Sequence, residues 1–378
     1  MLIVLSSLVA EGCPQLALQL TRYLQQKGLH VELMVLTRQP LDLLPEFEAL
    51  GVAIHWLALG GGLGRYPCLA WHTYRLCRRL RPSAVLSFPL GWHAFIAIGA
   101  RSAGVRRVCA HVGNLPPVWT GSAFRKFKLL VQLGRPFTHR LLCCSDYIRH
   151  ATCRDFGVSL CETRTVYNAC DLERLTTCCP VSAAGRPWPR HQPPQLSMVA
   201  RLEQHKDQPT LIRAMALLRD QGQPLQLWLI GEGSSRPDLE ALIAALDLVG
   251  SVQLLGSRRD IPQLLAATDL FVFSARPDEG FGIALAEAMA AGVPIVATDV
   301  GACHEVLEGG RLGRLVPPQD PEALAEGIRE VLTDPETAAR HAWLARQRAL
   351  RDFSVESMAV AYGRELGLDG GRAPSLPR

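Results

Sequence analysis

The chain has 378 residues and a mass of 41.4 kDa, which is long for one ordinary domain and predicts two or three. Hydrophobic residues make up 48% and charged residues 20%, and Gly and Pro number 32 and 26, which excludes a disordered, fibrous or low-complexity chain. Residues 1–180 carry 20 Lys and Arg against 10 Asp and Glu, whereas residues 181–378 carry 20 against 25. A basic half joined to an acidic half indicates two parts with different partners.

The first half alternates short apolar runs with helical patterns. The N-terminal run lacks a basic segment and is followed by Glu11, so we expect a buried strand there rather than a signal peptide. Residues 82–100 carry no charge, but Pro89 and Gly91 interrupt them, which favours a strand, a turn and a buried helix over a membrane span. We predict strands at residues 2–6, 31–36, 52–57, 84–88, 107–112, 140–144 and 165–167, with helices such as 15–27 and 66–80 between them.

A proline-rich stretch separates this half from a second series of elements. Five prolines fall within residues 176–195, which is typical of a linker. After it we predict strands at residues 196–200, 225–230, 252–255, 270–273, 295–298 and 314–316, and helices at 207–219, 236–247, 260–267, 282–291, 321–333 and 354–366. The predicted organisation is a first domain of residues 1–178, a linker of 179–194, a second domain of 195–350, a C-terminal helix within 351–366 and a disordered tail of 367–378.

This alternation predicts parallel sheets with helices on both faces. The expected fold class is therefore α/β, with two doubly wound, Rossmann-like domains. Ligands of such sheets bind beyond the carboxyl ends of the strands. We expect the two sheets to face one cleft, to which each domain contributes part of a site.

The segment 276–294 carries the sharpest chemical pattern, since it follows a predicted strand and opens a predicted helix. Gly280 and Gly282 permit close backbone approach, and free amides at a helix start favour an anion such as a pyrophosphate. Glu279 and Glu287, eight residues apart, place two carboxylates around this anion site, where they suit sugar and ribose hydroxyls. The structural alternative is that Glu279 caps the helix and Glu287 is solvated.

Two loops at the start of the second domain add to this pattern. Arg201 and Lys206 follow its first predicted strand, and a guanidinium fork with a compact ammonium suits a diphosphate. Ordinary surface charges are the alternative. The sequence Gly-Glu-Gly at residues 231–233 ends the next strand and indicates only that something approaches the backbone there.

In combination, these residues resemble the nucleotide-sugar-binding domain of retaining glycosyltransferases of family four, which have the GT-B architecture. The shared features are the Glu-x7-Glu spacing from Glu279 to Glu287, the Glu-Gly-Phe-Gly sequence that begins it, Arg201 with Lys206, and the Gly-x-Gly at residue 231. The resemblance covers residues 195–335 closely, and the first domain in outline.

The resemblance implies transfer of a sugar from a nucleoside-diphosphate sugar with retained anomeric configuration, and with neither metal nor other cofactor. Arg201 and Lys206 would neutralise the leaving diphosphate. Glu279 would contact donor sugar hydroxyls and would not act as a nucleophile, in contrast to glycosidase carboxylate pairs. Glu287 would contact the ribose. The residues that we expect to bind the donor are Gly12, Gly231, Glu232, Gly280, Phe281, Gly282, Ile283 and Glu287.

Two expectations concern the first domain. His111 lies near the end of the predicted strand 107–112, where similar enzymes place a histidine that faces the donor sugar; a buried structural histidine is the alternative. The family often has Gly-Gly after the first strand, whereas this chain has the single Gly12 in residues 11–14, which weakens the case for close backbone approach there. In relatives, a C-terminal helix crosses back to this domain, and we expect the same of 351–366.

The excess of basic residues in the first half suggests what kind of acceptor the protein uses and where in the cell it works. Residues 122–133 combine Arg125, Lys126 and Lys128 with aromatic residues in an amphipathic pattern, which suits an anionic bilayer and a lipid-linked acceptor; a solvated basic face is the alternative. The 12 cysteines include no Cys-x-x-Cys, so we expect reduced thiols and no zinc site. The predicted location is cytoplasmic, with peripheral contact at the inner membrane face, and no nucleic-acid partner is expected.

The predicted function is transfer of a hexose from a nucleoside-diphosphate sugar to a glycan, lipid-linked or small-molecule acceptor. Two alternatives stay open: a GT-B nucleotide-sugar epimerase with the same donor pocket, and a non-catalytic nucleotide-sugar-binding protein. A dinucleotide oxidoreductase is disfavoured because no Gly-x-Gly-x-x-Gly follows the first strand.

Overall fold

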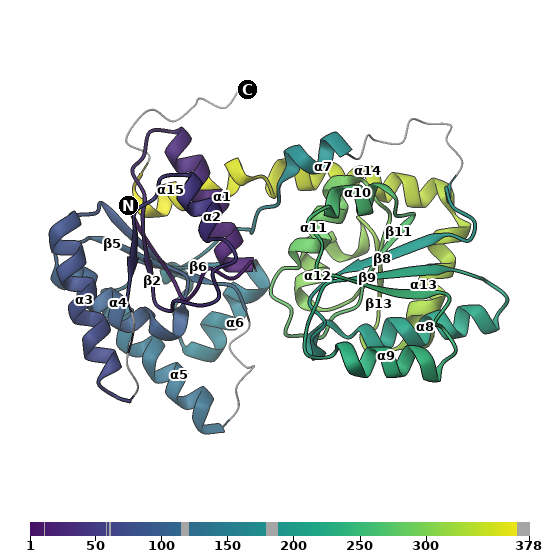
Figure 1. The fold of residues 1–378 in the computed structure, drawn as a ribbon, viewed down its shortest axis with the longest axis horizontal. Coiled ribbons are helices and arrows are strands. Elements are labelled where there is room, and N and C mark those ends of the chain that lie inside the picture. The colour runs from purple at the N-terminus through teal and green to yellow at the C-terminus, as the bar shows by residue number, and fades with distance from the viewer. Residues whose placement is uncertain (11, 58, 60–61, 115–120, 179–187, 369–378) are drawn as a thin grey trace. The chain divides into compact units, whose positions relative to one another are not determined.

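The computed structural model describes residues 1–10, 12–57, 59, 62–114, 121–178 and 188–368. They form two compact units, Met1–Ala169 with Val355–Arg378, and Cys170–Ser354 (Figure 1). Residues 170–178, which the sequence analysis placed in the first domain, are therefore part of the second unit. Residues 179–187 of the predicted linker and 369–378 of the predicted tail lie outside the described residues.

The first unit contains a parallel sheet whose described strands follow the order β3-β2-β1-β4-β5-β6-β7. Strands β1 and β4 are buried along their whole length, as is typical of a sheet covered on both faces. The last strand begins two residues earlier than predicted, because a capped 3-10 turn at Leu160–Glu162 delivers Thr163 into the ladder beside Leu141. The strands are β1 (Leu2–Leu5), β2 (Glu32–Val35), β3 (Ile54–Trp56), β4 (Ala84–Ser87), β5 (Arg107–Val112), β6 (Arg140–Cys143) and β7 (Thr163–Thr165).

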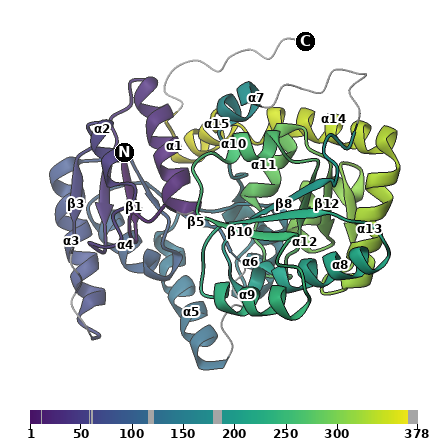
Figure 2. The same ribbon diagram turned by 45° about the vertical axis from the view of Figure 1, so that its right-hand side comes forward.

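Helices from both ends of the chain lie side by side on this sheet: α1 (Gly12–Gln26) packs against α15 (Val355–Leu366), as both ribbon views show (Figures 1 and 2). The uncharged stretch at residues 82–100 forms β4 and then α4, as predicted. Within the described residues, no helix has the length and apolar character that a membrane crossing requires. The other helices of this unit are α2 (Leu44–Ala49), α3 (Arg65–Leu80), α4 (Leu90–Ser102), α5 (Gly121–Gly134) and α6 (Asp146–Phe156).

The second unit contains another parallel sheet, with the order β10-β9-β8-β11-β12-β13 among the described strands. Helices α8, α9 and α13 cover one face, and α10, α11, α12 and α14 the other (Figures 1 and 2). The predicted fold class, two Rossmann-like α/β domains, is thereby confirmed. The strands are β8 (Gln195–Val199), β9 (Gln226–Ile230), β10 (Val252–Gly256), β11 (Leu270–Phe273), β12 (Ile295–Thr298) and β13 (Arg314–Val316). The helices are α7 (Leu172–Cys178), α8 (Gln208–Asp220), α9 (Arg236–Ala245), α10 (Ile261–Ala266), α11 (Ile283–Ala291), α12 (Gly301–Val306), α13 (Pro321–Thr333) and α14 (Pro335–Asp352).

A buried carboxylate fixes the point where the chain enters this second sheet. Asp269 is fully buried and accepts hydrogen bonds from the backbone N–H groups of Arg190 (2.8 Å) and Gln195 (2.9 Å). It also contacts His191 Nδ1 at 2.8 Å, the backbone N–H of His191 at 3.3 Å and the Arg190 guanidinium at 3.4 Å. Buried carboxylates need such partners, and here they hold the end of the predicted linker against the start of β11.

Candidate functional site

The loop between β11 and α11 presents backbone N–H groups without partners inside the helix. Gly282 is the N-cap of α11, with φ of 78°, and Ile283 begins the helix. The amides that precede and open a helix have no carbonyl four residues earlier to bind, so they attract anions. The loop at Gly280–Gly282 therefore has the local geometry that the predicted anion site needs, and binding of a pyrophosphate there stays a prediction.

The anion in this site is the carboxylate of Glu279 itself. Its Oε1 accepts hydrogen bonds from the N–H groups of Gly280 (3.2 Å) and Gly282 (3.1 Å), and Phe281 N lies at 3.5 Å. Its Oε2 pairs with Lys206 Nζ. Glu279 thus binds the loop amides that precede α11 and not the amides of the helix itself, with 8% of its surface exposed. We call this group of three amides, Glu279 and Lys206 the carboxylate nest.

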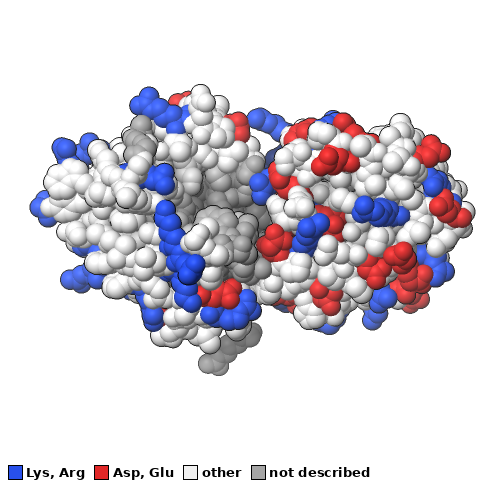
Figure 3. Space-filling view, turned by 90° about the horizontal axis from the view of Figure 1, so that it is seen from below, with Lys and Arg blue, Asp and Glu red and all other residues white. Residues whose placement is uncertain are grey.

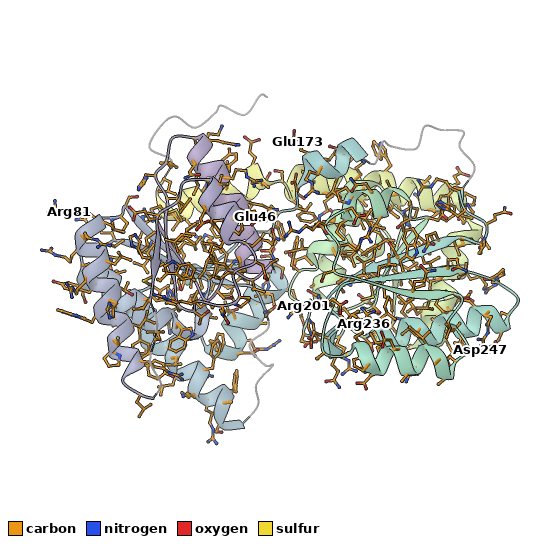
Figure 4. All side chains as sticks on the ribbon, in the orientation of Figure 1. Glu46, Arg81, Glu173, Arg201, Arg236 and Asp247 are labelled. Atoms are coloured by element: carbon orange, nitrogen blue, oxygen red, sulfur yellow. The ribbon has the colours of Figure 1, made fainter. Side chains whose placement is uncertain are left out.

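Lys206 reaches the nest from the loop that follows β8. It lies at the end of a 3-10 turn, and its ammonium sits 5.4 Å from the centre of the Phe273 ring. Burial alone would raise the pKa of Glu279, but the adjacent Lys206 ammonium outweighs it and holds that pKa below its ordinary value. The other predicted cation of this loop, Arg201, is exposed just beyond β8 (Figure 4). The structure therefore joins Lys206 to the nest and leaves the Arg201 side chain at the surface.

The glycines after β9 are explained by a neighbouring loop. A Cβ atom at Gly231 would lie 2.0 Å from the carbonyl oxygen of Ala200. One at Gly233 would lie 2.3 Å from that of Leu202. Glu232, 48% exposed at its side chain, pairs with Arg236 at 2.6 Å. The backbone that approaches these glycines is thus the chain's own, and donor contact by Gly231 and Glu232 stays a prediction.

Glu287 lies one turn into α11, in a setting opposite to that of Glu279. Its carboxylate is half-buried and has no hydrogen bond within the described residues. Burial, and next the negative charge of Asp171, raise the pKa of Glu287 to about 7, although the Arg174 guanidinium acts in the other direction. Glu287 is thus only partly exposed, unlike a fully solvated surface carboxylate. Contact with a ribose stays a prediction.

The first unit holds the two remaining candidates. His111 in β5 is 1% exposed, and its Nδ1 lies 2.8 Å from the hydroxyl of Tyr362 in α15. Burial lowers the pKa of His111 to about 4, so the ring is neutral near pH 7. Gly12 begins α1 and is exposed, while Glu11 lies outside the described residues. Sequence reasoning missed Tyr362, since nothing local ties residue 362 to residue 111.

The described residues contain no group of three or more His, Cys, Asp or Glu side chains placed to hold a metal ion.

Phe281, the remaining donor-binding candidate, is buried and packs edge-on against Phe353 with ring centres 5.2 Å apart. Its side chain therefore anchors the loop, and its backbone faces the nest.

We predict that Glu279→Gln destabilises the second unit at neutral pH. The variant leaves the Lys206 ammonium buried without a counter-charge, which costs about 3 kcal/mol of unfolding free energy. Because the pKa of Glu279 is depressed in the folded state, its contribution is present above the ordinary value of 4.5 and is lost as the pH falls through the folded pKa. Urea unfolding from pH 3 to 8 should show the deficit shrinking in acid. The control Glu326→Gln, in a half-exposed pair with Arg329, should change little, and an equally stable Glu279→Gln would contradict the prediction.

We predict the opposite sign for Glu287→Gln. With a folded pKa of about 7 against an ordinary 4.5, the folded wild-type chain binds more protons, so its stability falls as the pH rises between these values. The variant should be more stable than the wild type by about 2 kcal/mol at pH 8 and equal to it at pH 4. Urea unfolding at the two pH values tests this, with the exposed Glu322→Gln as control. A gain that is the same at both pH values would refute the assignment.

Both halves of the sequence match models of known protein families. The family model described as Glycosyl transferases group 1 matches residues 186–348, and the model described as Glycosyltransferase Family 4 matches residues 11–174. Glycogen synthase of Mycobacterium tuberculosis is 31% identical over 223 residues, which are 58% of this chain and 52% of that protein. Alpha-D-kanosaminyltransferase of Streptomyces kanamyceticus is 33% identical over 181 residues, 46% of each chain. The chain thus spans about half the length of these curated relatives.

Solved structures share the fold over nearly the whole chain. HepE of Anabaena, crystallised with UDP and glucose, superposes with a TM-score of 0.81 at 21% identity, covering 97% of this chain and 98% of that one. Sucrose-phosphate synthase of Thermosynechococcus elongatus gives 0.74 at 19% identity, covering 96% and 97%. Two Rossmann-like units and two family models that together match most of the sequence lead to one conclusion: the chain belongs to the family 4 glycosyltransferases, which have the GT-B fold.

Proposed function

We propose that this protein is a retaining hexosyltransferase that uses a nucleoside-diphosphate sugar. The observation that carries the proposal is the carboxylate nest, in which three backbone amides and the Lys206 ammonium converge on one anion. These are the donors that a diphosphate requires. The HepE crystals that contain UDP with glucose, and UDP-glucose, are consistent with such a ligand.

Donor binding requires the nest to be shared between Glu279 and the diphosphate. A lysine ammonium has three N–H donors, of which Lys206 gives one to Glu279. We propose that the others, together with the exposed Arg201 of the same loop, contact phosphate oxygens. Glu279 keeps its charge at neutral pH, so its carboxylate accepts hydrogen bonds from sugar hydroxyls. Glu287 accepts from the ribose, and binding is strongest when its carboxylate is ionised.

In the proposed reaction, the bond between the anomeric carbon and the diphosphate oxygen breaks while the acceptor oxygen bonds to the same face of that carbon. The leaving phosphate oxygen takes the acceptor proton, which balances the step and retains the configuration. Lys206 and Arg201 stabilise the charge that develops on the leaving group, where fixed cations act most strongly. We propose that these two side chains supply this neutralisation without a metal ion.

The test is release of nucleoside diphosphate from UDP-glucose, UDP-GlcNAc, UDP-galactose and GDP-mannose, each incubated separately with EDTA or with Mg²⁺. We expect slow hydrolysis of one donor with either addition, and a 10²–10³-fold lower rate in Lys206→Met. Lys206→Arg, which keeps the charge, should lose less, and the exposed Lys27→Met should match the wild type. Binding without turnover of any donor would overturn the transferase proposal in favour of a binding protein, and interconversion of donors would indicate an epimerase.

We further propose that the first unit contacts an anionic membrane through α5. Arg125, Lys126, Lys128, Leu129 and Leu133 are exposed and fall within about 160° of the helix circumference. Leu129 and Leu133 are 68% and 45% exposed. Figure 3 shows Lys and Arg along the visible face of this unit, whereas both signs are intermixed on the second. A face with cations and leucines suits a bilayer and a lipid-linked acceptor.

Sedimentation with vesicles tests the membrane proposal. The wild type should sediment with phosphatidylglycerol vesicles at low salt and not with phosphatidylcholine vesicles. Changing Arg125, Lys126 and Lys128 to Glu should weaken binding by roughly 100-fold or more, since each basic residue contributes about 1 kcal/mol. Trp343→Ser, which removes an exposed apolar residue from the second unit, serves as control. Binding to both lipids alike, or unaltered by the triple change, would refute the role of α5.

A further inference from the structure

Tyr362 and His111 form an isolated buried pair in the first unit. Each is 1% exposed, and the hydroxyl of Tyr362 lies 2.8 Å from Nδ1 of His111. The other ring nitrogen, Nε2, is buried without a hydrogen-bond partner in the described residues. The Phe88 ring covers one side of the imidazole, with ring centres 5.0 Å apart.

The hydrogens of this pair can be counted. Burial keeps His111 neutral and Tyr362 protonated, so the pair carries one N–H and one O–H. If the Tyr362 O–H donates to Nδ1, the ring hydrogen is on Nε2, and that N–H alone lacks a partner. If Nδ1–H donates to the Tyr362 oxygen, both the phenol O–H and the Nε2 lone pair lack one. Since each unmet buried polar group costs free energy, the first arrangement is favoured.

Helix α15 holds Tyr362 in place on both sides. Glu356, in its first turn, accepts a hydrogen bond from Tyr23 of α1 at 3.3 Å. Glu365, in its last turn, lies 3.6 Å from Arg140 and 3.7 Å from Arg164. Anchors before and after Tyr362 fix the hydroxyl in position.

The unpartnered nitrogen lies at the carboxyl end of β5, the edge at which parallel sheets bind ligands. A Cβ atom at Gly113 would lie 2.9 Å from Nε2 of His111 and 3.6 Å from the sulfur of Cys13, beside the first turn of α1. Glycine at 113 therefore leaves no side chain of its own against this buried nitrogen.

We propose that Tyr362 is a positioning residue, which fixes His111 as the Nε2–H tautomer so that a neutral N–H is held at the carboxyl end of β5 for a hydroxyl of a bound sugar. This inference rests on the proposed function for its ligand, though not for the tautomer. A sugar hydroxyl suits a neutral hydrogen-bond donor of this kind. The function of Tyr362 is thus to set the hydrogen-bonding polarity of a residue 251 positions earlier in the chain.

The first test is the tautomer in the ligand-free full chain, read from ¹⁵N shifts of selectively labelled histidine, with the His111 signals assigned by their loss in His111→Gln. The wild type should carry hydrogen on Nε2, and Tyr362→Phe should give a mixture or the Nδ1–H form. Tyr74→Phe, which removes a hydroxyl from α3 of the same unit, should leave the spectrum unchanged. A wild-type Nδ1–H tautomer, or a tautomer that Tyr362→Phe does not alter, overturns the proposal whether or not the protein is active.

The second test is kinetic. Tyr362→Phe should lower kcat/KM about tenfold for the donor that the wild type uses, and Tyr74→Phe should not. In a His111→Ala background, Tyr362→Phe should have no further effect, since it acts through His111. An additive effect, or full activity after the tautomer has changed, overturns the link to the donor sugar. Absence of turnover in the wild type is a failure of the proposed function and leaves the spectroscopic result decisive for the tautomer.

Discussion

A carboxylate that is withdrawn from water must be both neutralised and hydrogen-bonded, and Glu279 obtains both from two loops of the second unit. Lys206, after β8, supplies the charge, and the loop amides that precede α11 supply the hydrogen bonds. Such buried pairs add little net stability compared with apolar packing. What this one provides is geometry: it ties two adjacent strand ends together around a preformed anion site. The rest of the candidate donor site is arranged about this point.

The two carboxylates of the Glu-x7-Glu pattern have pKa values that their surroundings shift in opposite directions. The Lys206 ammonium holds the pKa of Glu279 below its ordinary value, while burial and Asp171 raise that of Glu287 to about 7. Titratable neighbours with divergent pKa values commonly have different roles. At neutral pH, Glu279 is fully charged and internally satisfied, whereas Glu287 is partly protonated and lacks a hydrogen bond in the described structure. A ligand can therefore supply the hydrogen bond that Glu287 lacks. Without a ligand, the folded chain bears the free-energy cost of this partly buried carboxyl group.

Strands such as β1, β4, β11 and β12 were predictable because they are short apolar runs buried on both faces of a sheet, whereas β7, with the sequence Thr-Arg-Thr, has no such pattern. Helix α14 was not, because its buried face is made of small residues and arginines rather than a clear apolar stripe. Arg346 Nη1 donates to the carbonyl of Ala290 at 2.9 Å, and Arg348 to that of Glu305 at 2.7 Å. These arginines satisfy carbonyls at the ends of α11 and α12, a packing role that hydrophobic periodicity does not detect. The anion site was predictable from its glycines, but the identity of its occupant depended on the fold.

The dependence of a site on contacts distant in sequence matters even more for His111. Its place near the end of β5 follows from local sequence, but its chemistry depends on which ring nitrogen carries the hydrogen, and this is decided by Tyr362 in a helix that comes after the whole second unit. The two units thus contain different kinds of hydrogen-bond donor. In the proposed function, the charged Lys206 suits phosphate oxygens, whereas a neutral imidazole N–H suits a hydroxyl because it adds no charge. The neutral N–H of His111 therefore depends on two residues, 111 and 362, that are separated in the sequence by the whole second unit. They meet because the chain returns to its first unit through α15.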